Sequence, residues 1–485
     1  MAEEITVEKK LKSNVFVDQT LDYSVVEGTT EGEKIKTKKD VSSWVNAGAG
    51  NDTITGLGKY DMLAGNEGDD VINASKAKGS VEIYGGENND NLTGSKYADY
   101  LAGGTGDDVI RGGKGNDTLR GGTPGVENEQ NNVKDTFLFY KGDGVDVIRD
   151  ATSEDVIEFA DRKSFAGLTF EQGKDAEGNL TADLVIKDKY NNITVQNYFV
   201  EDKENEGAWK VSENAVNQFA LKNGTYTLEW RTSNVTGASN MYNIVEGSND
   251  AETIAPSVGI SNWVNANAGE DIIKGINQGD MLAGNLGSNT INASKAKGNV
   301  EIFGGLDNDT ITGSKYNDFI TGGTGNDVIR GGKGNDTLRG GTPGVDNEQN
   351  TGKDTFVFYK GDGKDVIKGI DGDDVIQLAN VKKGGFTQSL DGDDLVISYN
   401  GGKDSITINN YLSDLDNIPD FSIETKDGTI YKAANIDELK GWVSAWTSAT
   451  GEKDFATALD NATSDETAIL AAIFEQYNFQ EVPQA

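Results

Sequence analysis

The chain repeats a short pairing of one polar position with one apolar position. An Asp recurs at nine-residue intervals, and a large aliphatic residue follows it two positions later, as in Asp108-Val109-Ile110 and Asp117-Thr118-Leu119. The residues around each aliphatic position alternate in side, which predicts a very short strand with one inward side chain. Because one such unit cannot bury its aliphatic residue alone, the pattern predicts stacked units around a continuous aliphatic ladder.

The complete unit reads Gly-Gly-x-Gly-x-Asp-x-U-x, where U is a large aliphatic residue. The frames that begin at Gly103, Gly112, Gly322 and Gly331 match every position. Three glycines among four residues favour a turn with positive φ, or a place where two backbones approach too closely for a Cβ atom. We therefore expect each coil to consist of two nonapeptide units, with one turn on each side.

A longer repeat encloses the short one. Residues 47–55 return as 266–274, and the same offset along the chain places Asp155 on Asp374. The chain is therefore two copies of one module, each a little under half of the sequence, followed by a tail. The second copy departs from the Asp position once, at Asn289, and the frames that begin at Gly56 and Gly275 lack the second and fourth glycines. We expect weaker or absent sites in these three frames.

Stacking of the coils places Asp above Asp at a spacing of two nonapeptides, as in Asp99 and Asp117. Stacked carboxylates repel one another, and glycine turns leave carbonyl oxygens without partners, so a hard cation with six to eight oxygen ligands would satisfy both. Magnesium retains its waters in a tight octahedron, so calcium fits better. The candidate calcium-binding carboxylates are Asp52, Asp61, Asp70, Asp90, Asp99, Asp108, Asp117, Asp135, Asp271, Asp280, Asp309, Asp318, Asp327, Asp336 and Asp354.

The composition of the chain excludes several classes of site and partner. The 485 residues include no Cys and no His, which excludes disulfide scaffolds, thiolate metal sites and histidine-based catalysis. Eighty acidic against 44 basic residues give a formal charge of −36, which disfavours nucleic acid as a partner and favours a cation. The sequence contains no apolar run long enough for a transmembrane helix, so we expect no membrane insertion of that kind.

The nonapeptide frames resemble the RTX (repeat-in-toxin, haemolysin-type) calcium-binding repeats. The resemblance implies parallel β-rolls that hold about eight to twelve Ca²⁺ ions between stacked turns. It also implies that backbone carbonyls of the glycine-rich turns join the Asp ligands. In the complete frames these glycines are Gly103, Gly104, Gly106, Gly112, Gly113, Gly115, Gly322, Gly323, Gly325, Gly331, Gly332 and Gly334.

Segments that follow each series of frames complete the predicted organisation. Residues 134–148 and 353–367 resemble the closing segment of RTX blocks, and 182–199 and 393–412 alternate apolar and polar residues around turns, as β-hairpins do. The predicted domains are an N-terminal β-rich cap (1–46), a first roll (47–160), a β-rich connector (161–265), a second roll (266–379), a β-hairpin cap (380–434) and a helical tail (435–485).

The tail has two predicted helices. Asn435 can cap the first, and Thr463 with Glu466 forms a capping box for the second. One interpretation is a helical hairpin that packs on the last β-element or on another copy. The other is the uncleaved C-terminal signal that a type I exporter reads, which the RTX resemblance implies. Residues 1–12 have no apolar segment of the kind that an N-terminal export signal requires, which favours the second interpretation.

We therefore expect an all-β protein of two tandem calcium-binding parallel β-rolls with a short helical tail. The expected function is non-enzymatic: a secreted or cell-surface protein that folds on extracellular calcium and serves as an adhesin, surface-layer or matrix component. The expected partners are calcium and a type I exporter, with self-association or a cell-surface polysaccharide as further candidates. The alternative is a polysaccharide-binding or polysaccharide-modifying RTX protein.

Overall fold

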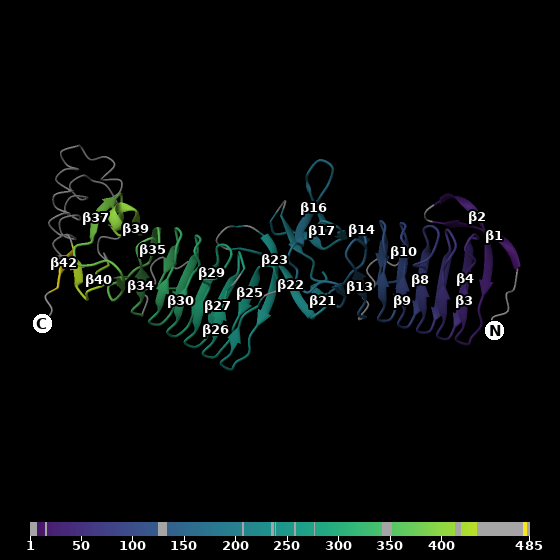
Figure 1. Cartoon of the computed structure of the whole chain (residues 1–485), viewed down its shortest axis with the longest axis horizontal. Helices are drawn as coiled ribbons and strands as arrows, with labels where there is room; N and C mark the ends of the chain where they lie inside the picture. Colours follow the sequence, from purple (N-terminus) through teal and green to yellow (C-terminus); the bar gives the residue numbers. More distant parts are fainter. Residues whose placement is uncertain are drawn as a thin grey trace. The chain divides into compact units, whose positions relative to one another are not determined.

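The computed structural model divides the chain into two compact units, which Figure 1 colours from purple to teal and from teal to yellow. The first comprises Met1–Ser233 with Gly237–Asn243, and the second comprises Asn234–Thr236 with Ile244–Ala485. The structure describes residues 7–14, 17–124, 133–205, 208–233, 237, 239–256, 259–275, 277–341, 352–412, 419–433 and 479–482.

The first unit is a parallel β-roll with two sheets, and the chain passes from one sheet to the other at every turn. The first sheet contains, in spatial order, β1 (Val7–Asn14), β2 (Val17–Glu27), β4 (Ser43–Ala49), β6 (Met62–Glu67), β8 (Glu82–Glu87), β10 (Tyr100–Thr105), β12 (Thr118–Arg120), β14 (Val145–Ile148), β18 (Asn192–Val195), β17 (Leu180–Lys187) and β16 (Thr169–Lys174). The second contains β3 (Lys34–Lys36), β5 (Thr53–Thr55), β7 (Val71–Asn73), β9 (Asn91–Thr93), β11 (Val109–Arg111), β13 (Thr136–Phe139), β15 (Val156–Phe159), β21 (Gln218–Leu221) and β22 (Gly224–Thr232).

The register confirms the coil length that the repeat predicts. Leu101 of β10 pairs with Leu119 of β12, two nonapeptides further along the chain, and the strands run parallel. All seven aliphatic residues at position eight of the first copy are fully buried, so they form the predicted internal ladder. These residues are Ile54, Leu63, Ile72, Leu92, Leu101, Ile110 and Leu119.

An interruption of the repeat at residues 74–84 is accommodated inside the roll. Leu63 of β6 pairs with Ile83 of β8, so this coil is slightly longer than its neighbours, and the ladder continues through it. Ala74 and Ala77 are buried in the extra turn, where only small side chains fit beside the coil, while Ser75 and Lys76 are exposed.

The second unit repeats the same two-sheet roll. One sheet contains β24 (Thr253–Ile254), β26 (Ile272–Lys274), β28 (Thr290–Asn292), β30 (Thr310–Thr312), β32 (Val328–Arg330), β34 (Thr355–Phe358), β36 (Val375–Leu378), β40 (Ser422–Thr425), β41 (Ile430–Ala433) and β42 (Phe479–Glu481). The facing sheet contains β25 (Asn262–Asn265), β27 (Met281–Asn285), β29 (Glu301–Gly305), β31 (Phe319–Gly323), β33 (Thr337–Arg339), β35 (Lys364–Lys368), β39 (Asp404–Ile408), β38 (Asp394–Tyr399) and β37 (Phe386–Asp391).

Both hairpins that the sequence predicts are present. β17 pairs antiparallel with β18, and β38 pairs antiparallel with β39 across the 3₁₀ turn η1 (Asn400–Gly402). A further antiparallel pair, β19 (Phe199–Glu201) with β20 (Trp209–Val211), lies in the connector, and β23 (Ser239–Glu246) pairs with β22. The hairpins end each roll with antiparallel strands that extend the parallel sheet.

The all-β fold is confirmed, and the described residues differ from the prediction at the start of the first roll and in the tail. Parallel pairing begins before residue 47, because β2 already pairs with β4 and β3 with β5. The predicted helices of the tail, including Asn435, Thr463 and Glu466, lie outside the described residues. Within the predicted tail, β42 is a strand and pairs antiparallel with β41.

Candidate metal centre

The Asp residues at position six of each frame lie in the turns of the rolls and are buried. One oxygen of each carboxylate holds the coil before it in register. Asp108 Oδ1 accepts the backbone N–H of Asp90 at 2.8 Å, and Asp117 Oδ1 accepts that of Asp99 at 2.8 Å. The Asp at position six is therefore a fixed part of the coil stack.

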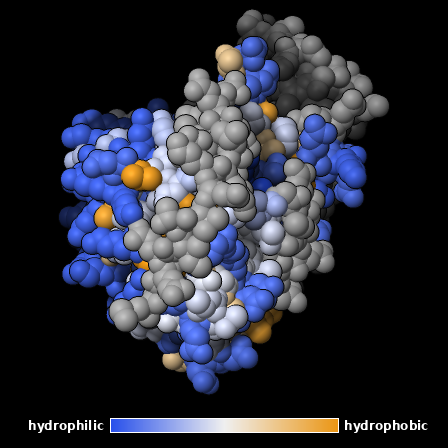
Figure 2. All heavy atoms as spheres, turned by 90° about the vertical axis from the view of Figure 1, so that its right-hand side faces the viewer, coloured by the Kyte–Doolittle hydropathy of each residue, from blue (hydrophilic) through white to orange (hydrophobic). Residues whose placement is uncertain are grey.

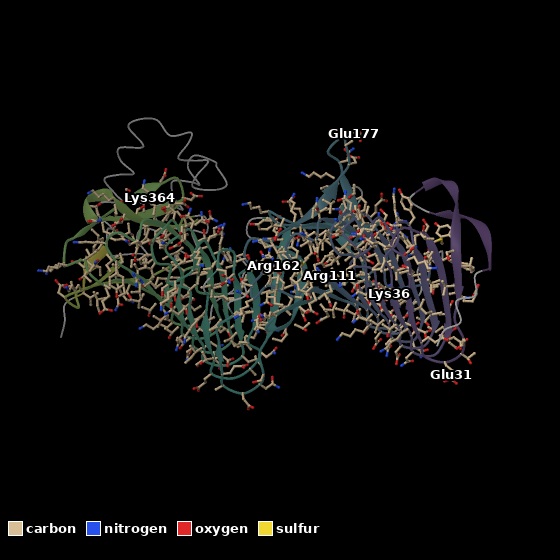
Figure 3. The ribbon with its side chains drawn as sticks, turned by 45° about the vertical axis from the view of Figure 1, so that its right-hand side comes forward. Glu31, Lys36, Arg111, Arg162, Glu177 and Lys364 are labelled. Carbon is tan, nitrogen blue, oxygen red and sulfur yellow. The ribbon has the colours of Figure 1, made fainter. Side chains whose placement is uncertain are left out.

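The turns form two opposite edges of each roll. In the first unit the acidic edge consists of the turns that carry Asp52, Asp70, Asp90 and Asp108, whose exposed positions include Glu67, Asp69, Glu87 and Asp107. The lysine edge consists of the turns that carry Asp61, Asp99 and Asp117, whose exposed positions include Lys59, Lys76, Lys78, Lys96 and Lys114. Glu31, in the turn that begins the acidic edge, lies at the rim of the first unit, away from the Glu177 hairpin (Figure 3).

Nine of the candidate carboxylates have a second oxygen, Oδ2, that is buried without a hydrogen-bond partner among the described residues. An unpartnered buried carboxylate oxygen carries a large desolvation cost, so these atoms require a positive partner. The nine residues are Asp52, Asp70, Asp90, Asp108, Asp117, Asp271, Asp309, Asp327 and Asp336.

A glycine hydrogen faces each oxygen of this kind in the complete frames. A Cβ atom on Gly103 would lie 2.0 Å from Asp108 Oδ2 and 2.6 Å from the carbonyl oxygen of Gly121, one coil further on. In the second unit a Cβ on Gly322 would lie 2.1 Å from Asp327 Oδ2 and 2.8 Å from Gly340 O. The first glycine of the frame thus keeps open a cradle of carboxylate and carbonyl oxygens, which is the donor set that calcium prefers.

Burial makes these carboxylates costly to ionise without a cation. Desolvation, reinforced by the neighbouring Asp charges, raises the pKa of Asp108 to about 8 and that of Asp336 to about 8. Burial also raises the pKa of Asp90 and Asp327 to about 7. A bound divalent cation would reverse these shifts by stabilising the charged form.

Four of the candidate carboxylates have protein donors on both oxygens. Asp99 Oδ1 accepts the Ser95 hydroxyl at 3.0 Å, and its Oδ2 accepts the Ser95 backbone N–H. Asp318 has the same contacts with Ser314. Asp61 and Asp280 accept donors from their own turns and from the preceding coil.

The sequence marks this difference at position two of the frame. The residue there is Leu57, Ser95, Ile276 or Ser314 in these four frames. In the frames with an unpartnered Oδ2 it is Gly or Asn with a positive φ, as in Gly104, Gly323, Asn66 and Asn267. Where position two is neither Gly nor Asn, protein groups donate to both carboxylate oxygens.

Asn289 places a donor where its counterpart in the first unit, Asp70, has an unpartnered oxygen. Asn289 Oδ1 accepts the N–H of Asp271 at 2.9 Å, so the side chain keeps the register contact. Its Nδ2 group donates to the carbonyl oxygen of Gly287 at 2.8 Å. The amide therefore satisfies a carbonyl internally and presents N–H groups that repel a cation.

The series of stacked Asp residues extends beyond the predicted ligands. Asp117 N–H donates to Asp146 Oδ1 at 3.0 Å and Asp135 N–H to Asp155 Oδ1 at 2.8 Å, with Asp365 and Asp374 in the equivalent places of the second unit. These four lie outside the frames from which the ligands were predicted, yet residues 141–149 and 360–368 keep Gly at positions two and four, Asp at position six and Ile at position eight, and this was the available signal. The predicted Asp135 and Asp354 lie within the same ladders, between Asp108 and Asp155 and between Asp327 and Asp374.

Among the described residues, no three acidic side chains gather at one point. An ion held here would take its ligands from carboxylates of successive coils and from the glycine carbonyls beside them. This arrangement supplies oxygen ligands only and suits a hard cation.

Comparisons with known proteins agree with this chemistry. The family model described as the RTX calcium-binding nonapeptide repeat matches residues 46–76, 84–119, 259–291, 297–315 and 303–338. The haemolysin-type calcium binding protein related domain matches residues 394–435, which include β38 and β39. No curated protein sequence matches the chain.

Among solved structures, the extracellular lipase LipA from Serratia marcescens is similar over 70% of this chain, at 14% identity and a TM-score of 0.13. The match spans 42% of the lipase chain, which is less than half its length. The fold assignment therefore rests on the strand register described above. In the described part of the chain, no helix has the length and hydropathy needed to cross a bilayer.

Proposed function

Because this chain is an RTX calcium-binding repeat protein, we propose that it is secreted and that calcium outside the cell makes its two rolls rigid. In this proposal the rolls have a structural role at the cell surface, as part of an adhesin, a surface layer or a matrix. The observation that carries the proposal is the set of buried, unpartnered Oδ2 atoms.

Calcium would supply the charge and the coordination that the turns lack. In the first unit Asp90 and Asp108 on the acidic edge would hold ions through Oδ2, together with carbonyls such as that of Gly121, and Asp117 would hold another on the opposite edge. For extracellular calcium modules Kd is about 10⁻⁴ to 10⁻³ M, so such sites fill outside a cell and stay empty in cytosol. At about 1 mM calcium and a Kd of about 0.1 mM, each site contributes about 1.4 kcal/mol to stability.

Export and calcium binding support each other in this proposal. In low calcium the stacked Asp carboxylates repel one another, so the chain stays unfolded enough to pass through a secretion channel. It folds when it reaches calcium outside the cell. We assign the export signal to residues 435–485, by the RTX resemblance.

A non-enzymatic role is part of the proposal. The sequence contains no His or Cys, and a duplicated roll lengthens a scaffold or multiplies a binding surface without a catalytic site. Screening the purified protein with uronic-acid polymers and with lipid esters tests this part. Turnover that survives repurification and is lost on heat denaturation would contradict it.

Secretion is tested by expressing the full chain beside a type I exporter and measuring it in the medium. The proposal expects export that is lost when residues 435–485 are deleted and retained when the exposed turn 175–179 between β16 and β17 is deleted. Light scattering and electron microscopy of the exported protein should show assembly with calcium and dispersal with EDTA. Export without the tail, or a dispersed monomer at every calcium concentration, would contradict the proposal.

A further inference from the structure

Charge is segregated between the two edges of the first unit. The acidic edge exposes Glu67, Asp69, Glu87 and Asp107, whereas the lysine edge exposes a Lys in turn after turn. Its exposed lysines are Lys38, Lys39, Lys59, Lys76, Lys78, Lys96, Lys114, Lys141 and Lys189. In a chain with a formal charge of −36, this concentration of cations on one edge creates a local positive row.

Tyrosine rings accompany the lysines along this row. Lys59 Nζ lies 4.6 Å from the centroid of the Tyr60 ring, and Lys96 Nζ lies 5.2 Å from that of Tyr97. Tyr97 is 36% exposed and Tyr190 is 45% exposed, so their rings are accessible from outside. Lys141 Nζ lies 4.2 Å from the Tyr190 centroid, which continues the pairing at the closing end of the roll.

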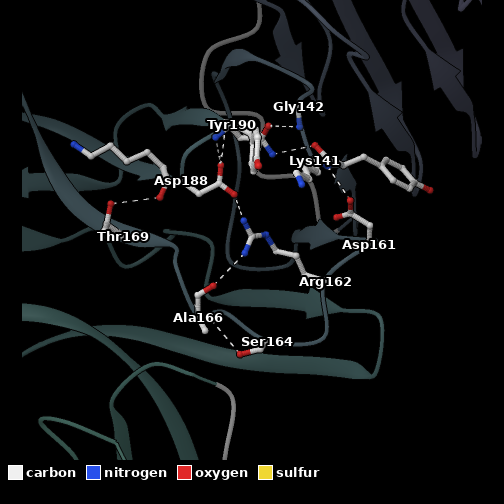
Figure 4. Close-up of polar contacts among 12 residues, drawn as sticks. Lys141, Gly142, Asp161, Arg162, Ser164, Ala166, Thr169, Asp188 and Tyr190 are labelled. Atoms are coloured by element: carbon white, nitrogen blue, oxygen red, sulfur yellow. Dashed lines mark hydrogen bonds and ion pairs between the residues drawn. The ribbon is translucent and has the colours of Figure 1, made fainter. Parts of the chain in front are cut away.

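Two acidic groups near the row pair with arginines, and the position-six Asp residues beneath it are buried. Asp143 is buried and pairs with Arg111 at 3.2 Å, and Asp188 pairs with Arg162 (Figure 4). The exposed acids beside the row are Asp40, and Asp161, whose Oδ2 accepts the Lys141 backbone N–H at 3.0 Å. The row therefore keeps a net positive charge along its length.

The turns that carry the row are stacked rigidly. Lys78 N–H donates to Gly58 O at 3.1 Å, Lys114 N–H donates to Ser95 O at 3.2 Å, and Gly142 N–H donates to Asn191 Oδ1 at 2.8 Å (Figure 4). Successive coils lie about 4.8 Å apart, the spacing of paired strands, which is close to the length of one sugar residue. The row is thus a linear, evenly spaced array of cations and rings.

We propose that the lysine edge of the first unit binds a linear polyanionic glycan of the uronic-acid type. Such a chain carries one carboxylate on each sugar, and its pyranose rings can pack on aromatic faces, so it matches both components of the row. A row one residue wide fits a single extended chain better than a duplex or a flat anionic membrane. In the end-on view of Figure 2, the described surface is mainly hydrophilic and its hydrophobic residues lie apart.

The second unit provides an internal comparison. At the positions of Lys59 and Tyr60 it has Gln278 and Gly279, so its row begins later, with Lys295, Lys297, Lys315 and Lys333. The proposal therefore expects a weaker glycan site on the second unit than on the first.

The experiment measures binding of short polygalacturonate fragments, too short to gel, to the full chain in saturating calcium by isothermal titration. The triple variant Lys59→Gln, Lys96→Gln, Lys114→Gln removes charge from the row. The matched variant Lys34→Gln, Lys36→Gln, Lys134→Gln removes three exposed lysines, two from β3 and one from the acidic edge. We expect the first to weaken binding by about tenfold or more and the second by less than about twofold.

Further variants and competing ligands test whether the lysines and tyrosines of the row bind the glycan. Tyr97→Ala should weaken binding severalfold, and Gln278→Lys should strengthen it. Equal affinity of the two triple variants would overturn the proposal and point to glycan bridged by bound calcium. Tighter binding of single-stranded DNA, or of phosphatidylserine vesicles, than of polygalacturonate would also overturn it, as would lysine-dependent dimerisation without glycan binding. Circular dichroism of each variant with calcium reports the roll itself, so failure of this proposal is distinguishable from failure of the proposed function.

Discussion

Asp108 divides its two carboxylate oxygens between two tasks with respect to Asp90. Its Oδ1 accepts the backbone N–H of Asp90 at 2.8 Å, while its Oδ2 is buried and has no hydrogen-bond partner among the described residues. The first contact fixes the register of the coils, and we propose the second oxygen as a calcium ligand. One residue type at one position would then serve both the fold and the metal.

Removing one free ligand should remove one calcium site. Asp108→Asn keeps an oxygen for the Asp90 N–H but replaces Oδ2 with a donor, so we expect loss of calcium binding beside it and a smaller calcium-dependent rise in Tm. The matched variant Asp107→Asn changes an exposed carboxylate in the same turn. Equilibrium dialysis with radioactive calcium measures both, and equal calcium counts for the two variants would contradict the assignment.

Adding the missing carboxylate should create a site. Asn289→Asp removes the Nδ2 group that donates to Gly287 O and restores the oxygen that Asp70 presents in the first unit. We expect the calcium count to rise by about one and stability in calcium to rise by about 1–2 kcal/mol. Stability in EDTA should fall, because an uncompensated charge is added to the ladder. An unchanged calcium count would contradict this explanation of the asymmetry between the copies.

Replacing the first glycine of a frame with alanine should have the same effect as removing the carboxylate oxygen beside it. In Gly322→Ala the new methyl group would lie 2.1 Å from Asp327 Oδ2, so we expect loss of one calcium ion and about 1–3 kcal/mol of stability. Gly372→Ala is the control, since its new methyl group would lie no closer than 3.9 Å to the backbone of Asp420, and we expect a change within about 0.5 kcal/mol. Urea unfolding in calcium compares them, and equal stability of the two variants is the contrary result.

Ser95 donates to both oxygens of Asp99, so we expect Asp99 to be held in place without calcium. Ser95→Ala removes the hydroxyl that donates to Asp99 Oδ1 at 3.0 Å, which should cost about 1.5–3 kcal/mol. The cost should be similar with calcium and at mildly acidic pH without it, and the calcium count should not change. Ser75→Ala, at an exposed turn serine, is the control. A lower calcium count in Ser95→Ala would show that Asp99 binds calcium after all.

Without calcium, acid should stabilise the rolls. Burial raises the pKa of Asp108 to about 8 and of Asp90 to about 7, above the ordinary Asp value, so the folded state binds protons that the unfolded chain releases. Their contribution is therefore complete below pH about 4 and is lost as the pH rises through about 7 to 8. We expect far-UV circular dichroism in EDTA to show more β-structure at pH 5 than at pH 8. Equal spectra at the two pH values would contradict the role of these carboxylates.

Much of the architecture follows from the nine-residue period. Position eight is always aliphatic, and the buried ladder from Ile54 to Leu119 shows why, since each coil has room for one such side chain per turn. The internal duplication, which places Asp155 on Asp374, likewise predicts the second unit. The period does not mark the first coils, because β2 and β3 pair with β4 and β5 through backbone groups that any sequence supplies.

The missing glycines predict weaker sites at Asp61 and Asp280, but the period does not separate the other position-six Asp residues, which the structure does. Asp99 and Asp108 occupy the same position in their frames, yet Ser95 satisfies the first and Gly103 leaves the second open. The distinction depends on which groups from the same turn reach Oδ2. The residue at position two of the frame decides this, but its effect can be seen only in the geometry of the turn. Asp155 was missed because the stacking of Asp residues continues where the glycines have ended, whereas Asp146 lies in a frame that keeps two of its glycines, Gly142 and Gly144.

The central claim is that calcium occupies the places beside the unpartnered Oδ2 atoms. A crystal structure of the protein grown in calcium, with an anomalous difference map, tests it most directly. We predict peaks about 2.4 Å from Oδ2 of Asp108, Asp117, Asp327 and Asp336, with glycine carbonyls completing each ligand set. We predict none beside Asp99 and Asp318, whose oxygens accept Ser95 and Ser314. Absence of ions beside Asp108 and Asp327, or ions beside Asp99 and Asp318 with those serines displaced, would contradict the account.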